Sequence, residues 1–301
     1  MLRRLEELDR LDALAGGVGK ATVPYASAPP PRRRSWGLTT VLMGLLVVGL
    51  TTGLVQLRKE LAPRMQPVID AYVPPPVTTS DRPTGISATS LTRVLPHPEP
   101  PPGEGGYAFV RDNGDGPAAY DPCRPVKFVM VEEFSVPGAE NLLTEALVAA
   151  TRASGTQLVY EGPTNETASM SRQTMDKYRY GDRWSPVLVS FTTPDRIPRL
   201  QGRTVGIGGS SSVEDDEGTL LNVTGLVYLD GPAFRQVLAG DGGHDHAVAI
   251  ITHELGHVLG LGHVDDPSQL MAPENTGQVG FGDGDLRGLA VLADRPCQFG
   301  L

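Results

Sequence analysis

A run of 22 residues without a charged side chain, from Trp36 to Leu57, separates the first 35 residues from the rest of this 301-residue chain. At a rise of about 1.5 Å per residue, such a run forms a helix of about 33 Å, which is long enough to cross a bilayer. A buried core helix would need a polar face, whereas the Thr and Gly residues here are scattered among Leu and Val. We therefore predict a transmembrane helix over residues 36–57, and a membrane is an expected partner. Within it, Gly49 and Gly53 are a weak hint of a homodimer, because small residues at this spacing let two helices approach closely.

Basic residues are more numerous before residues 36–57 than directly after them. Residues 1–60 contain 9 Lys+Arg and 5 Asp+Glu, a net charge of +4, which leaves 17 and 30, a net charge of −13, for the remainder. By the positive-inside rule, residues 1–35 are cytoplasmic and the C-terminal part lies outside the cell. A cleaved signal peptide is the main alternative, but its apolar run is shorter and begins earlier. We predict an uncleaved signal anchor, and hence a single-pass protein of the cell membrane.

Prolines dominate the stretch that follows. Residues 61–102 contain 11 prolines and show no sustained apolar period. Such a segment favours extended polyproline II structure and cannot bury a core of its own. We therefore predict that residues 58–119 form a Pro-rich stalk, at which cleavage could also release the C-terminal part.

Residues 120–301 have the pattern of a folded domain. Short β-rich runs alternate with helical patterns, an order that predicts an α/β fold with helices packed against a sheet. The expected strands are residues 126–131, 158–160, 187–192, 204–208 and 226–229, and the expected helices are residues 139–153 and 245–259. The net charge of −9, without a basic stripe among aromatic residues, argues against a nucleic-acid partner.

The chain contains two cysteines, Cys123 and Cys297, which bracket this domain. Outside the cell they can oxidise, and a bridge that closes so long a loop stabilises a fold by about 4 to 5 kcal/mol on the chain-entropy model. In the alternative, the Cys123 thiol binds a metal and keeps an enzyme latent, which would leave Cys297 unpaired. We predict a disulfide.

The segment THELGHVLGLGHVDDPSQLM, residues 252–271, carries the candidate site. His253 and His257 are four residues apart on a predicted helix, so their imidazoles project from one face and can bind the same zinc ion. Glu254 is adjacent and can reach a water molecule on that metal. Without further ligands, the alternative would be a polar helix face that carries two idle histidines.

The residues after the helix strengthen the metal interpretation. Gly260 can adopt a positive φ, which ends the helix and turns the chain back, so that His263 can approach the same metal. Three nitrogen ligands leave one coordination position open for water. An open position is typical of catalytic zinc, whereas structural zinc has a fourth protein ligand.

The complete pattern HExxHxxGxxH, from His253 to His263, resembles the signature of the metzincin zinc endopeptidases. Met271, eight residues further on, is similar to the methionine of the metzincin Met-turn, and its spacing is that of the matrixins. Val264 stands where vertebrate matrixins have Ser, so the chain is more similar to the bacterial matrixin-like branch. The resemblance covers residues 120–301. It implies a twisted, mostly parallel sheet with an active-site helix and a C-terminal helix over residues 282–293, for which Asp285 is a candidate N-cap.

The resemblance also implies a function, the hydrolysis of peptide bonds in a protein or peptide substrate. Zinc would be held by the three histidines, Glu254 would act as general base, and Met271 would support the base of the site. The substrate would lie extended along an exposed edge strand near residues 205–209, where the glycines suggest close backbone approach.

Two further features leave alternatives open. The acidic run Glu214–Glu217 could hold calcium, but a charge run is usually a solvated turn, so calcium is not predicted. The alternative function is a catalytically silent zinc-binding or adhesion ectodomain on a stalk. That function would predict loss of the general base or of a ligand, yet all of these residues are present.

Overall fold

The computed structural model of the chain describes residues 68–74, 82–83, 92–114, 116–215 and 218–298. The predicted cytoplasmic and transmembrane segments, residues 1–35 and 36–57, lie outside the described residues. Among the residues that the structure describes, no helix is long and apolar enough to span a membrane.

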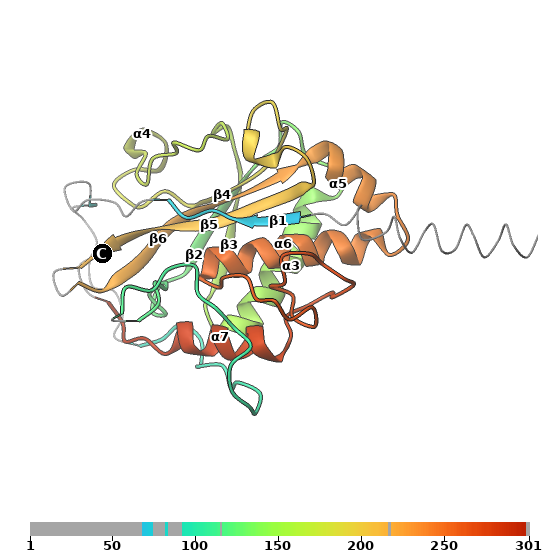
Figure 1. Cartoon of the computed structure of the whole chain (residues 1–301). Helices are drawn as coiled ribbons and strands as arrows, with labels where there is room; N and C mark the ends of the chain where they lie inside the picture. The colour runs from blue at the N-terminus through green and yellow to red at the C-terminus, as the bar shows by residue number, and fades with distance from the viewer. Residues whose placement is uncertain (1–67, 75–81, 84–91, 115, 216–217, 299–301) are drawn as a thin grey trace, which may run out of the picture. The chain divides into compact units, whose positions relative to one another are not determined.

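A six-stranded sheet lies at the centre of the domain, with the strand order β1-β5-β6-β4-β2-β3 (Figure 1). Within the described residues, β5 and β6 pair antiparallel and every other pair of neighbouring strands is parallel. The predicted α/β fold with a mostly parallel sheet is therefore confirmed. The strands are β1 Val68–Ala71, β2 Val126–Val131, β3 Leu158–Thr164, β4 Val187–Thr192, β5 Thr204–Glu214 and β6 Leu220–Asp230.

Helices cover one face of the sheet, where α3, α6 and α7 lie together (Figure 1). The main hydrophobic core lies between these helices and the sheet. All six residues of β4 are buried, as expected for a parallel strand that is covered on both faces. The helices are α3 Ala139–Ser154, α4 Lys177–Tyr180, α5 Gly231–Leu238, α6 Gly243–Leu259 and α7 Asp283–Ala293.

The predicted boundaries agree with the structure where the local pattern is strong. β2 and β4 have the predicted limits, whereas β5 and β6 are longer than expected. Helix α5 was not predicted, although the sequence contains its start signal. Asp230 caps it by accepting a hydrogen bond from the amide of Ala233 (3.3 Å), and a proline follows within its first turn.

The prediction that the stalk extends to residue 119 is wrong. Residues 92–114 and 116–119 pack against the domain, where Phe109 forms a β-bridge with Leu261. The guanidinium of Arg93 donates a hydrogen bond to the carbonyl of Ala293 at the end of α7 (2.5 Å). Prolines prevent regular secondary structure in this stretch, but they do not prevent such contacts with the domain. It therefore belongs to the folded unit.

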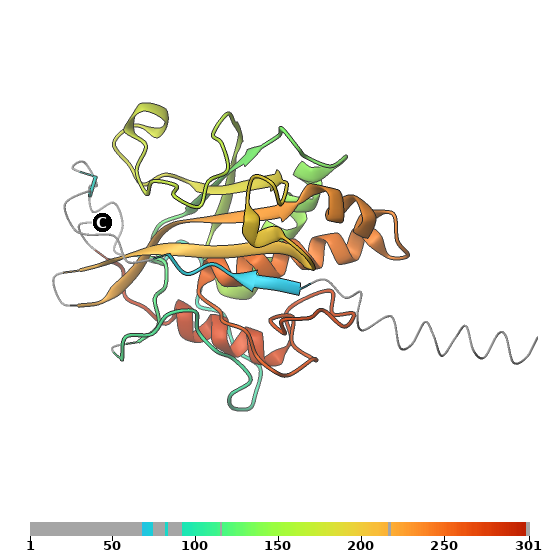
Figure 2. The same ribbon diagram turned by 45° about the horizontal axis from the view of Figure 1, so that its top comes forward.

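A second part of the predicted stalk also joins the fold. Strand β1 pairs in parallel with residues 204–208 of β5 and adds a strand to that edge of the sheet (Figure 2). The expectation that residues 205–209 form an exposed edge strand is therefore wrong. Prolines at positions 67 and 74 confine this segment to six residues, VIDAYV, which is too short to show a clear period.

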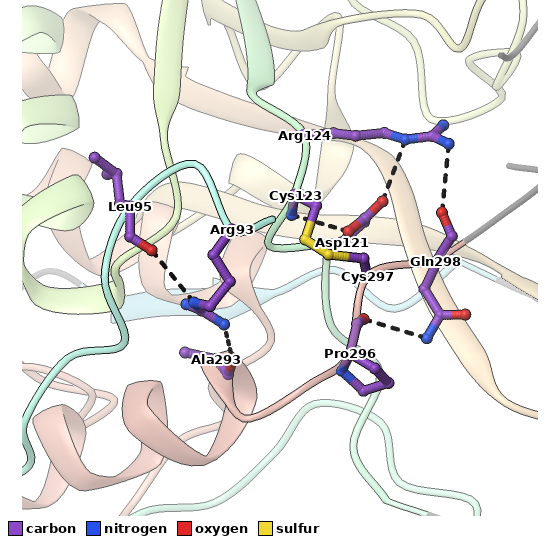
Figure 3. Close-up of a disulfide and its surroundings, with 9 residues drawn as sticks. All are labelled: Arg93, Leu95, Asp121, Cys123, Arg124, Ala293, Pro296, Cys297 and Gln298. Carbon is purple, nitrogen blue, oxygen red and sulfur yellow. Dashed lines mark hydrogen bonds and ion pairs between the residues drawn. A yellow bond between two sulfur atoms is a disulfide. The ribbon is translucent and has the colours of Figure 1, made fainter. Parts of the chain in front are cut away.

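The predicted disulfide between Cys123 and Cys297 is present, with 5.4 Å between the Cα atoms (Figure 3). It joins the segment before β2 to the chain after α7, so the alternative of a metal-binding Cys123 thiol does not hold. Asp121 supports the bridge by accepting a hydrogen bond from the amide of Cys123 (2.9 Å). Its other carboxylate oxygen pairs with Arg124, whose guanidinium also donates to the carbonyl of Gln298 (3.4 Å).

Replacing both cysteines with serine should lower the free energy of unfolding by about 2 to 5 kcal/mol, because the bridge closes a loop of 174 residues and so restricts the unfolded chain. Urea unfolding followed by circular dichroism measures this change. Wild-type protein in reducing agent is the control and should unfold at the same urea concentration as the double variant. An unchanged unfolding midpoint in both samples would show that the bridge contributes nothing.

Candidate metal centre

Helix α6 carries the HExxH pattern and is enclosed by the rest of the domain. It packs against α3 on one side and against β5 on another. Every residue from Ala249 to Leu259 is buried. A helix that is buried all round must place its polar side chains where other groups satisfy them, so the two histidines and the glutamate of this helix need specific partners.

Gly260 ends α6 in the way that the sequence predicted. Its φ is +124°, a conformation that side chains rarely adopt, and its amide donates a hydrogen bond to the carbonyl of Gly256 (3.1 Å). A Cβ atom at this position would also lie 2.8 Å from the carbonyl oxygen of Ala118. The chain therefore turns back immediately after the helix, and His263 returns to the face that carries the first two histidines.

The three histidines converge through their Nε2 atoms. The distance from His253 Nε2 is 3.0 Å to His257 Nε2 and 3.3 Å to His263 Nε2, and the last two atoms are 3.0 Å apart. The Nδ1 atom of His253 donates a hydrogen bond to the carbonyl of Leu270 (2.6 Å), and that of His257 donates to the carbonyl of Leu261 (2.8 Å). In both residues the proton is thus on Nδ1, which leaves a lone pair on Nε2.

This donor set fits a zinc ion. Three nitrogen atoms at Zn–N distances of about 2.0 to 2.1 Å in a tetrahedron lie about 3.4 Å from one another, close to the observed separations. Burial lowers the pKa of His253 to about 3, with the His263 charge as a second cause, and it lowers the pKa of His257 well below its usual value. Both imidazoles are therefore neutral at pH 7, which is the form that binds a metal.

Glu254 lies fully buried between α6 and β5. Two glycines of β5 provide the space for it, because a Cβ atom on Gly206 would lie 2.2 Å from Glu254 Oε1 and one on Gly208 would lie 2.8 Å from Oε2. The glycines from which we expected close approach of a substrate thus leave space for this glutamate of the same chain. Residues 206 and 208 face the same side of the strand, so a part of β5 without side chains lies directly beside the Glu254 side chain.

Met271 lies against α6 and is completely buried. A Cβ atom on Gly256 would lie 2.5 Å from the Met271 sulfur, so the absence of a side chain at Gly256 allows the methionine to approach the helix backbone. The amide of Val264 donates to the Met271 carbonyl (3.1 Å), which ties the turn to the chain next to His263. The structure thus places Met271 against the helix that carries the first two histidines.

Residues 203–292 match the matrixin family. The match begins just before β5, ends within α7, and includes the three histidines, the glutamate and the methionine described above. It confirms the resemblance to the matrixins and supports a domain of the zinc metallopeptidase kind. The match covers less than a third of the chain, so the residues before β5 are not part of it.

Two other comparisons give little beyond this family. No curated protein matches the chain. Among solved structures, archaemetzincin from Methanopyrus kandleri is similar at 13% sequence identity and a TM-score of 0.33, over 61% of this chain and 99% of that chain. A TM-score this low supports no argument, so the site must be interpreted from the matrixin segment and from the geometry of this chain.

Asp285 is a residue of the matrixin segment whose role the sequence did not reveal. The prediction that Asp285 is the N-cap of α7 is wrong, because Gly282 takes that position. The buried Oδ2 of Asp285 accepts hydrogen bonds from the amides of Gly282 (3.0 Å) and Leu270 (2.7 Å), and burial raises its pKa. Since the carbonyl of the same residue, Leu270, accepts the hydrogen bond of His253, Asp285 positions that histidine through the backbone of one residue.

Replacing Asp285 with Ala should weaken zinc binding by about 10- to 100-fold, because groups that orient a metal ligand contribute an effect of this size. Competition with a chromophoric chelator measures the zinc dissociation constant. Asp283→Ala is the matched control, because it removes the same charge from an exposed position in the first turn of the same helix. Equal zinc affinity in the two variants would contradict a positioning role for Asp285.

Proposed function

We propose that the chain is a zinc-dependent endopeptidase that hydrolyses peptide bonds in protein or peptide substrates. The observation that carries this proposal is the convergence of three Nε2 atoms within 3.3 Å of one another, with the buried Glu254 next to the first histidine in the sequence. Three nitrogen ligands leave a coordination position for water, as in catalytic rather than structural zinc sites. The match to the matrixin family supports the same reaction class.

The residues of the chain have separate roles in this proposal. His253, His257 and His263 hold the ion, which when bound supplies a Lewis acid that lowers the pKa of water and polarises the scissile carbonyl. The Glu254 carboxylate accepts a proton from the attacking water and donates it to the leaving amine. Burial against the bare backbone of β5 fixes the direction of this carboxylate. Met271 would support the helix that carries the first two histidines rather than hold the ion.

We also propose that this peptidase domain lies outside the cell on a single-pass membrane anchor. The support is the uncharged run over residues 36–57, with more basic residues before it than after it. The disulfide between Cys123 and Cys297 fits an oxidising compartment. A homodimer through Gly49 and Gly53, release by cleavage in the stalk, and calcium at Glu214–Glu217, of which residues 216 and 217 lie outside the described residues, remain predictions.

Glu254→Gln should reduce peptide cleavage by the zinc-loaded full chain at least 100-fold, because general acid–base catalysis contributes about 10² to 10⁴ to the rate. Cleavage of a peptide library is followed by mass spectrometry, with zinc content measured in parallel. Glu140→Gln is the matched control, since Glu140 is exposed on α3, and it should retain activity. Full zinc content with no cleavage by the wild type would favour the silent binding module, and chelation of zinc should abolish any activity.

Deletion of residues 36–57 should move the protein from the membrane fraction to the soluble fraction, because the only long uncharged run in the chain is removed. Protease added to intact cells should degrade the domain of the full chain and leave an N-terminal tag intact. Membrane association that survives the deletion, or a tag that is digested together with the domain, would contradict the proposed anchor or its orientation.

A further inference from the structure

Strand β1 occupies the edge of β5 beside the proposed general base. Its register places Ile69 opposite Gly206 and Ala71 opposite Gly208, which are the two glycines that face Glu254. β1 also contacts α6, the helix that carries the HExxH pattern. The backbone edge next to the glutamate is therefore filled by a segment that lies more than 130 residues earlier in the same chain.

The end of β1 is held by contacts from several parts of the domain. The amide of Tyr72 donates to the carbonyl of Gly208 (2.7 Å), and its hydroxyl donates to the carbonyl of Met170 (3.0 Å). Arg199 donates to the carbonyl of Ala71 (3.0 Å), and its guanidinium carbon lies 5.6 Å from the centre of the Tyr72 ring. A cation over an aromatic ring at this distance adds a modest attraction.

The backbone of β5 is shaped to accept this segment closely. A Cβ atom on Gly209 would lie 1.8 Å from the carbonyl oxygen of Tyr72, so even an alanine at that position would push the strand away. Arg111 donates a further hydrogen bond to the carbonyl of Pro74. β1 is thus docked by backbone pairing, by two arginines and by one aromatic side chain. Its docking also requires Gly209, a glycine that does not face Glu254.

We propose that β1 is an autoinhibitory strand, which must leave β5 before an extended peptide substrate can pair there. The inference rests on the proposed peptidase function. Each amide and carbonyl on the outer edge of β5 can serve one neighbouring strand at a time, so β1 and an added substrate strand exclude each other. Because β1 belongs to the same chain, it competes with a substrate at a high effective concentration.

The strand is also short enough to be displaced. It has four residues, which is near the lower limit for strands in proteins, and the side chain of Val73 just after it is 49% exposed. Short edge elements with few buried contacts open at low free-energy cost. A docked strand should raise the apparent KM in inverse proportion to the fraction of molecules in which it is undocked, and it should leave kcat unchanged because the substrate-bound form is the same.

Tyr72→Pro in the zinc-loaded full chain tests this inference. Proline has no amide hydrogen, so the variant loses the hydrogen bond to Gly208 together with the contacts of the tyrosine ring. We expect KM for a cleaved peptide to fall about tenfold with unchanged kcat, and Arg199→Ala to lower KM by a smaller factor. Val73→Pro is the matched control, because it adds a proline to the same segment but retains Tyr72, and it should leave KM unchanged.

Hydrogen–deuterium exchange of residues 68–74 shows whether the strand is docked, independently of activity. We expect protection in the wild type and in Val73→Pro and rapid exchange in Tyr72→Pro. Rapid exchange in the wild type would overturn the inference. So would an unchanged KM in a Tyr72→Pro protein whose strand is shown to be released.

A binding probe separates failure of this inference from failure of the proposed function. A fluorescent peptide hydroxamate, titrated by anisotropy, should bind Tyr72→Pro about tenfold more tightly than the wild type. If no form of the protein cleaves any peptide, the peptidase proposal fails, while tighter binding of the probe to Tyr72→Pro still supports the blocking strand. Equal affinity of the two proteins for the probe, including no binding to either, overturns it.

Discussion

Three imidazoles that point their Nε2 atoms at one another, two of them neutral with a lone pair on Nε2, are the central constraint of this domain. The Nε2 atoms lie 3.0 to 3.3 Å apart, at the end of a helix that is buried along most of its length. Such lone pairs repel unless a cation lies among them, so other groups must hold the rings in place. The carbonyls of Leu270 and Leu261 do so directly, and Asp285 in turn holds the peptide of Leu270.

A second constraint is that two different segments must approach β5 closely, and the glycines of this strand make that possible. Gly206 and Gly208 leave space for the Glu254 side chain and the backbone of α6, whereas Gly209 leaves space for the carbonyl of Tyr72. Successive residues of a strand face opposite sides, so side chains at these positions would displace different neighbours. The same short glycine run therefore determines both the position of Glu254, the proposed general base, and the position at which β1 docks.

The features that the sequence predicted are those with a local signature. The limits of β2 and β4 follow from compact β-rich runs, and the candidate metal ligands follow from spacing on one helix and a glycine that ends it. Three other features depend on contacts between residues far apart in the chain. These are the pairing of β1 with β5, the packing of residues 92–114 and 116–119 against the domain, and the hydrogen bond from the Leu270 amide to Asp285. Prolines around β1 suggested a stalk, yet the six residues between them are enough to form a four-residue strand once a partner edge is present.

The disulfide also limits how the proposed peptidase can be kept inactive. Cys123 and Cys297 are the only cysteines of the chain, and they are bonded to each other, so no thiol remains to occupy the open metal position. A thiol latch is opened by a covalent change and is either on or off. Inhibition by a strand such as β1 instead varies with the substrate, because a substrate that pairs strongly with β5 displaces β1 more effectively than one that pairs weakly. In this chain, inhibition by β1 would therefore select substrates by their ability to form an added strand as well as by their side chains.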